Sequence, residues 1–124
     1  MPGRMDLKDT ILILAETKDG NPLKDLPNDM SSTPFVIFAA WVRFWMGLIL
    51  QRFENTPYQV SLEDLAEVLN DDDNPLKMLP EYEQYRSSDP PDDVTVPGPI
   101  FEEFTIWYAE AIARYIENKQ GGNI

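Results

Sequence analysis

The sequence predicts a small all-α protein, a bundle of about four helices around a central hydrophobic helix at residues 34–55. Three observations support this fold class. Fourteen of the sixteen residues from 35 to 50 are apolar, helix-capping signals precede other apolar segments, and few segments have the alternating pattern of a strand. The alternative is an α+β fold with one or two short strands.

The length of 124 residues and the content of 43% hydrophobic and 11% aromatic residues predict one domain, residues 1–124, with its own core. We expect frayed ends at residues 1–5 and 120–124. The sequence predicts neither an internal repeat nor a domain boundary.

The first apolar segment, residues 10–16, is compatible with a helix or with a buried strand. Asp6 is a suitable N-cap for a helix that would end near Asp19 and Gly20. The lack of an obvious partner strand favours the helix. Residues 20–33 contain glycine, prolines and turn-forming residues, which predict a loop.

The central helix is predicted to begin after an N-cap at Ser32 or Thr33, with Pro34 at its first position. Small or polar residues recur along it at steps of three and four. They predict a narrow exposed stripe on an otherwise buried helix, at Ala40, Arg43, Gly47, Gln51 and Glu54.

The later part of the chain is predicted to hold two shorter helical segments, a loop and a final helix. Ser61 and Asp64 resemble a capping box, which predicts a short helix that buries Leu62, Leu65, Ala66 and Leu69. Asn74 starts one further turn, through Leu79. Residues 80–99 contain five prolines and predict an acidic, proline-rich loop.

The final helix is predicted to begin at Gly98 and Pro99. Its apolar side is formed by Phe101, Phe104, Trp107 or Tyr108, Ala111 and Tyr115, and its polar side by Glu103, Glu110, Arg114 and Glu117.

The absence of cysteine and histidine excludes disulfides, thiol nucleophiles and imidazole ligands, and it removes the commonest general base. We therefore expect a protein that is not an enzyme, with no catalytic residues, no cofactor and no metal. No secretory signal is recognisable at the N-terminus, so we expect a cytoplasmic protein.

The acidic residues are concentrated late in the chain. Residues 61–93 hold eleven acids and two bases, within a net charge of −12 for the whole sequence. This charge predicts a protein partner with a basic surface and argues against direct binding to nucleic acid or to anionic membranes. The predicted partner-binding residues are Asp71, Asp72, Asp73, Glu81, Tyr82, Glu83, Tyr85, Asp92 and Asp93.

These residues have other interpretations. The acids at 71–73 could be solvated or could hold a divalent cation, although they lack the pattern of a calcium loop. The tyrosines could fold back over the core.

The aromatic residues of the central helix are predicted to lie in the core. The alternative is a homodimer interface formed by Phe38, Trp41, Trp45 and Gly47, where the glycine would let a second helix come close. A membrane span is disfavoured because residues 34–50 are at the short limit and Arg43 lies in their middle.

Together these observations predict a non-catalytic protein–protein interaction module, such as an assembly factor, an adaptor or a small regulator. The alternative is an inhibitor that mimics nucleic acid, for example a viral anti-defence protein. A metal-dependent enzyme is a third hypothesis.

Overall fold

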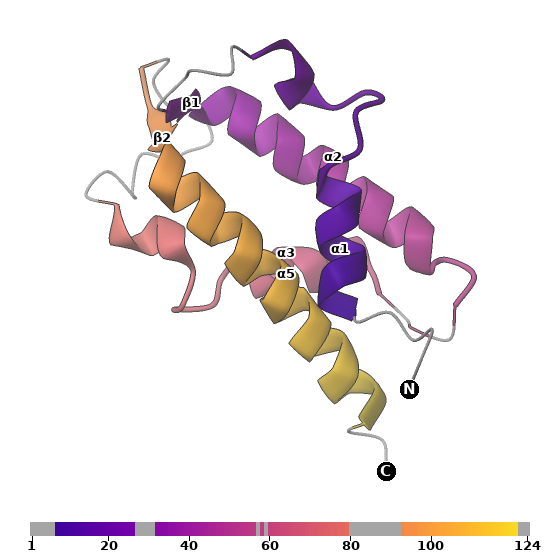
Figure 1. The fold of residues 1–124 in the computed structure, drawn as a ribbon. Coiled ribbons are helices and arrows are strands. Elements are labelled where there is room, and N and C mark those ends of the chain that lie inside the picture. Colours follow the sequence, from indigo (N-terminus) through magenta and orange to yellow (C-terminus); the bar gives the residue numbers. More distant parts are fainter. Residues whose placement is uncertain (1–6, 27–31, 57, 59, 80–92, 122–124) are drawn as a thin grey trace.

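The computed structural model describes residues 7–26, 32–56, 58, 60–79 and 93–121, and this part of the chain is a small helical bundle (Figure 1). Its α-helices are α1 (Leu7–Ala15), α2 (Phe35–Phe53), α3 (Leu62–Val68) and α5 (Gly98–Gly121). Two 3-10 helices, η1 (Pro22–Asp25) and η2 (Pro75–Met78), and two short strands, β1 (Ser32–Pro34) and β2 (Thr95–Pro97), connect them. The predicted helical bundle is confirmed, and the two strands belong to the alternative.

The two long helices, α2 and α5, diverge from the paired strands, and the two short helices lie against both of them. Figure 1 shows α1 in front of the long helices and α3 behind them. Buried side chains from all four α-helices join one hydrophobic cluster, with the large rings of α2 and α5 at its centre.

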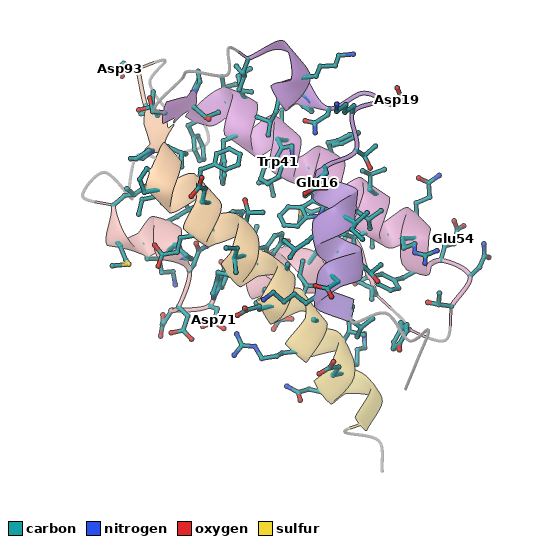
Figure 2. The ribbon with its side chains drawn as sticks, viewed as in Figure 1. Glu16, Asp19, Trp41, Glu54, Asp71 and Asp93 are labelled. Atoms are coloured by element: carbon teal, nitrogen blue, oxygen red, sulfur yellow. The ribbon has the colours of Figure 1, made fainter. Side chains whose placement is uncertain are left out.

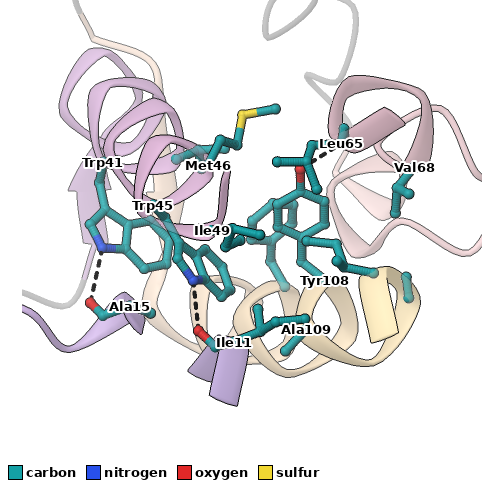
Figure 3. Packing of buried hydrophobic residues seen from close by; sticks show 14 of the residues in the cluster. Ile11, Ala15, Trp41, Trp45, Met46, Ile49, Leu65, Val68, Tyr108 and Ala109 are labelled. Carbon is teal, nitrogen blue, oxygen red and sulfur yellow. Dashed lines mark hydrogen bonds between the residues drawn. The ribbon is translucent and has the colours of Figure 1, made fainter. Parts of the chain in front are cut away.

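Helix α1 resolves the ambiguity of residues 10–16, although it ends at Ala15, before the predicted position. Its last carbonyls meet indole donors from α2 (Figure 3). Trp45 Nε1 donates to the carbonyl of Ile11 at 2.8 Å, and Trp41 Nε1 donates to that of Ala15 at 3.5 Å. The carbonyl of Ala15 is one of those that a helix end leaves without an intrahelical partner, whereas that of Ile11 lies one turn earlier and accepts the indole bond in addition to its helical one.

The predicted start of α2 is wrong, because Ser32 and Thr33 belong to β1 and do not cap the helix. Pro34 is the N-cap residue and makes no side-chain capping bond, while the N–H of Phe35 donates to the carbonyl of Val94 at 2.9 Å. The predicted stripe is confirmed, since all five of its residues are exposed: Ala40, Arg43, Gly47, Gln51 and Glu54.

The predicted loop at residues 80–99 is wrong at its C-terminal end. Residues 95–97 form β2 and residues 98–99 begin α5, because β1 supplies a hydrogen-bonding partner for this extended segment. Residues 80–92, the predicted frayed end at 1–5 and residues 122–124 of the predicted frayed end at 120–124 lie outside the described residues. Residues 120–121 are instead the last residues of α5. Within α5 the apolar and charged sides are as predicted, with Phe104 and Tyr108 buried and Glu103 and Glu110 exposed.

The described elements occur twice in the same order, so the prediction that the chain has no internal repeat is wrong. Each half runs from a short helix through a 3-10 helix and a strand to a long helix. The two 3-10 segments share a sequence, Asn-Pro-Leu-Lys-x-Leu-Pro, which begins at Asn21 in one half and at Asn74 in the other. Each of these asparagines caps its 3-10 helix by accepting a hydrogen bond from the N–H two residues later.

The antiparallel strands relate the two halves by a local twofold axis. Thr33 pairs with Val96, Ser32 with Pro97, and Pro34 with Thr95, so Thr33 and Val96 are equivalent positions that face each other. In the same register Phe38 corresponds to Phe101 and Trp45 to Tyr108. These equivalent rings also meet, with centroids 5.2 Å apart in the first pair and 5.4 Å apart in the second.

Hydrogen bonds between the short and long helices obey the same symmetry. Trp45 donates to Ile11 in one half, and the hydroxyl of its equivalent, Tyr108, donates to the carbonyl of Leu65 at 2.8 Å in the other (Figure 3). The fold is therefore a duplicated unit that closes on itself in the way that two subunits of a symmetric dimer do.

Candidate functional site

The strongest candidate site is an open apolar groove of about 670 Å³ between α2 and α3, here called the α2–α3 groove. Among the described residues that line it, Arg43 is the single charged one. The α2 wall consists of Phe35, Phe38, Ala39, Val42, Arg43, Met46, Gly47 and Leu50, and the remainder of Leu62, Ala66, Leu69, Leu76 and Phe104. This volume lies within the range of clefts that hold ligands or partner side chains.

The periodicity of the two helices creates this groove. On α2, Ala39, Val42, Met46 and Leu50 recur at three- and four-residue steps and therefore share one side of the helix. On α3, Leu65 turns into the core, while Leu62 and Ala66 are exposed.

The prediction that Leu62 and Ala66 are buried is thus wrong. The side chain of Leu62 is 57% exposed. Across the groove, no described atom lies within 4 Å of the position that a Cβ at Gly47 would occupy. The groove therefore remains open because α3 is too short and too far from this part of α2 to cover it.

Acidic side chains lie on α3 and in the loop after it; Glu63 adjoins the groove, whereas Glu67, Asp71 and Asp73 line a separate hollow between α3 and α5. Glu63 and Glu67 are exposed on α3, and Asp71, Asp72 and Asp73 are exposed in the loop that follows. Glu63 directly follows the groove residue Leu62 and lies one turn before Ala66. A partner in the α2–α3 groove would therefore meet negative charge beside α3.

A network of hydrogen bonds around Asp64 fixes α3 against α5. Asp64 accepts from the N–H of Ser61 at 3.0 Å and its own N–H donates to Ser61 Oγ at 3.2 Å, which confirms the predicted capping box. The same carboxylate accepts from the Tyr115 hydroxyl at 2.8 Å and from Lys119 at 3.0 Å. Desolvation raises the pKa of Asp64, but these hydrogen bonds outweigh it and lower the pKa to about 2.

The structure separates the predicted partner-binding acids that it describes. Asp71 and Asp73 line a polar hollow of about 550 Å³ between α3 and α5, which Arg114 and Tyr115 also line. Asp93 is exposed beside the strands, far from Asp71 (Figure 2). The other predicted residues lie outside the described residues: Glu81, Tyr82, Glu83, Tyr85 and Asp92.

The predicted dimer interface is divided by the fold. Phe38, Trp41 and Trp45 are buried and pack against the rings of α5, so they belong to the core of this chain. Gly47 alone of the four is exposed. A second copy could therefore reach Gly47 but not the three rings.

The described residues contain no group of three or more His, Cys, Asp or Glu side chains placed to hold a metal ion. Helix α2 is long and apolar enough to cross a membrane by length and composition. Seven of its residues are buried in the core, including Trp45 and Ile49.

The chain matches no family model, no curated protein and no solved structure. The function is therefore argued from the α2–α3 groove and its surroundings. Sequence reasoning missed this groove; the repeated Asn-Pro-Leu-Lys segments signal the duplication but do not by themselves align the helices that form the groove.

Proposed function

We propose that the protein is a non-catalytic interaction module that binds a partner protein with a basic surface. The observation that carries this proposal is the α2–α3 groove, an exposed apolar lining with the exposed acid Glu63 next to its residue Leu62, in a chain of net charge −12. A solvent-exposed apolar surface with a polar border is typical of protein-binding sites. The apolar part supplies affinity, and the acids favour a positively charged partner and accelerate its approach.

The chemistry of the groove supports binding and not catalysis. Catalysis by acids and bases needs polar groups that converge on one point. Around the groove, Arg43 and Glu63 are on opposite walls, and the described lining is otherwise apolar. The described acids at 71–73 and at 93 lie on different parts of the surface, an arrangement that does not favour the nucleic-acid mimic.

The experiment that tests this proposal is partner capture from the native host, followed by measurement with the purified partner. We expect the affinity to fall between low salt and about 0.5 M salt, where the screening length is well below 10 Å. We also expect the variant Ala66→Asp, which places a charge in the groove, to bind less. An affinity that changes neither with salt nor with this substitution would contradict the proposal.

The matched control is Ile106→Asp on α5, because Ile106 is also an exposed hydrophobic residue but does not line the groove. We expect this variant to bind the partner as the natural protein does. An equal loss of binding in both variants would mean that general surface hydrophobicity, and not the groove, holds the partner.

A further inference from the structure

The two halves of the chain form equivalent helix–helix interfaces that differ in one respect. Helix α1 packs on α5, and its counterpart α3 packs less extensively on α2, the counterpart of α5. The first interface is bridged by an ion pair, in which Lys8 Nζ lies 2.7 Å from Glu110 Oε1. The second contains the α2–α3 groove.

The register of the duplication shows what replaces the ion pair. Ile11 and Leu65 accept equivalent hydrogen bonds from Trp45 and Tyr108. Counting from these positions, Lys8 corresponds to Leu62, and Glu110 corresponds to Gly47. The interface of α1 and α5 therefore has the ion pair Lys8–Glu110. At the equivalent positions, the interface of α3 and α2 has an exposed leucine and a glycine.

These two replacements open the groove and make it apolar. At Gly47 the missing side chain leaves empty space next to α2, and at Leu62 an apolar side chain borders this space in the position of an ammonium group. An exposed leucine is unfavourable unless something covers it, and an exposed helical glycine costs about 0.5–1 kcal/mol relative to alanine. A bound partner would offset both.

From these observations, and resting on the function proposed above, we infer that the α2–α3 groove binds an amphipathic helix of the partner that carries basic residues on the flank facing Glu63. The two walls are helices with apolar residues at helical spacing, which is the geometry of a groove that accepts a third helix. Gly47 permits close approach of that helix to α2.

An apolar groove could also bind a second copy of the chain, a lipid surface or a small apolar ligand, and the charge of the protein argues against these occupants. The net charge of −12 opposes association of two copies, and contact through two grooves would place the Glu63 side chains near each other. The same charge opposes anionic lipid surfaces. A small apolar ligand would find in Arg43 the single charged group of the described lining to orient it. A basic helix satisfies both the apolar lining and the acidic border.

The test uses the full chain and a designed peptide of about 15 residues, the length at which an isolated helix becomes marginally stable. The peptide carries leucines at positions i, i+4 and i+7 and lysines along one flank. Binding is measured by fluorescence anisotropy, and methyl NMR locates the peptide on the protein. We expect shifts at Leu62, Met46 and Leu50, and an affinity at least about tenfold lower when the lysines are replaced by glutamates.

The decisive variant transfers the ion pair of the closed interface into the groove, as Gly47→Glu combined with Leu62→Lys. Both positions are exposed, so the variant should fold, and circular dichroism and thermal unfolding check this. We expect peptide binding to weaken by at least about tenfold, while Ile106→Lys, outside the groove, binds as the natural protein does.

Three results would overturn the inference: no binding of the lysine peptide, equal binding to the double variant, or methyl shifts away from the groove. Concentration-dependent self-association that the double variant abolishes would instead identify a second copy as the occupant and would also overturn it. If the native partner is captured in a salt- and groove-dependent way but the peptide does not bind, the helical ligand is wrong and the proposed function stands.

Discussion

The carboxylate of Asp64 accepts hydrogen bonds from three other residues, on α5 and at the start of α3. It caps α3 and accepts hydrogen bonds from Ser61, Tyr115 and Lys119. These contacts hold α3, one wall of the groove, against α5. Because the bonds require an ionised carboxylate, the position of the wall is coupled to the protonation of a single side chain.

Replacing Asp64 with asparagine should therefore destabilise the protein in a pH-dependent way. At pH 7 we expect a loss of about 1–2 kcal/mol in the free energy of unfolding, typical of a lost cap and a lost charged hydrogen bond. The Asp64 pKa is 3.8 ordinarily and about 2 in the folded protein, so the unfolded chain binds this proton first as the pH falls. Its contribution to stability is complete above about pH 4 and is lost between about pH 4 and pH 2.

Urea denaturation of both proteins from pH 7 to pH 2 measures this difference. The gap between natural protein and variant should narrow below about pH 4 and close near pH 2. The control, Glu63→Gln, changes an exposed neighbour on α3 that does not cap the helix, and should have only a small effect on stability. A gap for Asp64→Asn that is constant over this range would contradict the assignment.

Substitution of Gly47 should have the opposite effect from substitution of Asp64, because it should stabilise the free protein. It lies inside α2, and no described atom would contact an added Cβ. We expect Gly47→Ala to raise the free energy of unfolding by about 0.5–1 kcal/mol, measured by denaturant titration. Ala40→Gly, at another exposed position of the same stripe, should lower it by a similar amount. A loss of stability in Gly47→Ala would mean that this face of α2 is already in close contact with another segment.

At the scale of elements, local sequence signals predicted the helices well. Ser61 and Asp64 marked the start of α3, and the stripe from Ala40 to Glu54 marked the exposed side of α2. The alternative allowed one or two short strands, but their positions and the start of α2 were missed because the partner of Thr33 is Val96, far along the chain. A pairing of this kind depends on tertiary structure, and neither segment has a strand pattern of its own.

The α2–α3 groove was missed for a related reason. Periodicity identifies an apolar helix side but does not say how closely a neighbouring helix will cover it, so Leu62 and Ala66 were assigned to the core. The two Asn-Pro-Leu-Lys segments indicated a duplication, but the helices on either side of them are offset by different numbers of residues. The difference at Gly47 and Leu62 therefore becomes visible only with the hydrogen-bond and strand register of the structure.

The two equivalent asparagines give an element-scale prediction. Asn21 and Asn74 are buried, cap their 3-10 helices, and donate to the carbonyls of Thr17 at 2.8 Å and Leu69 at 2.9 Å. Substitution of either by alanine should cost about 1–3 kcal/mol, because the buried carbonyl and N–H lose their partner.

Aspartate at the same positions supplies a matched comparison, since it keeps the accepting oxygen but places a buried carboxylate against the carbonyl of Thr17 or Leu69, and it should cost at least as much as alanine. The double alanine variant should show nearly additive losses, because the two asparagines are in different halves and each bonds within its own half. Denaturant titration of the five variants tests this, and a loss confined to one half would show that the duplicated segments no longer have equivalent structural roles.

At the scale of the whole molecule, the duplication raises the question of whether the halves unfold separately. The interface between them is formed by the largest buried rings, with Trp41 stacked on Phe101 at 4.9 Å and Phe38 against Phe104 at 5.0 Å. Each half thus completes the core of the other, as the subunits of an obligate dimer do.

We therefore expect one cooperative unfolding transition. Tryptophan fluorescence, which reports Trp41, Trp45 and Trp107, and far-ultraviolet circular dichroism, which reports all helices, should give the same midpoint in urea. Tyr108→Phe removes a buried hydrogen bond in the second half and should lower the midpoint of both probes equally. Two separated transitions, or a Tyr108→Phe effect seen by one probe alone, would show that the halves are independent and that the rings at their interface contribute little to stability.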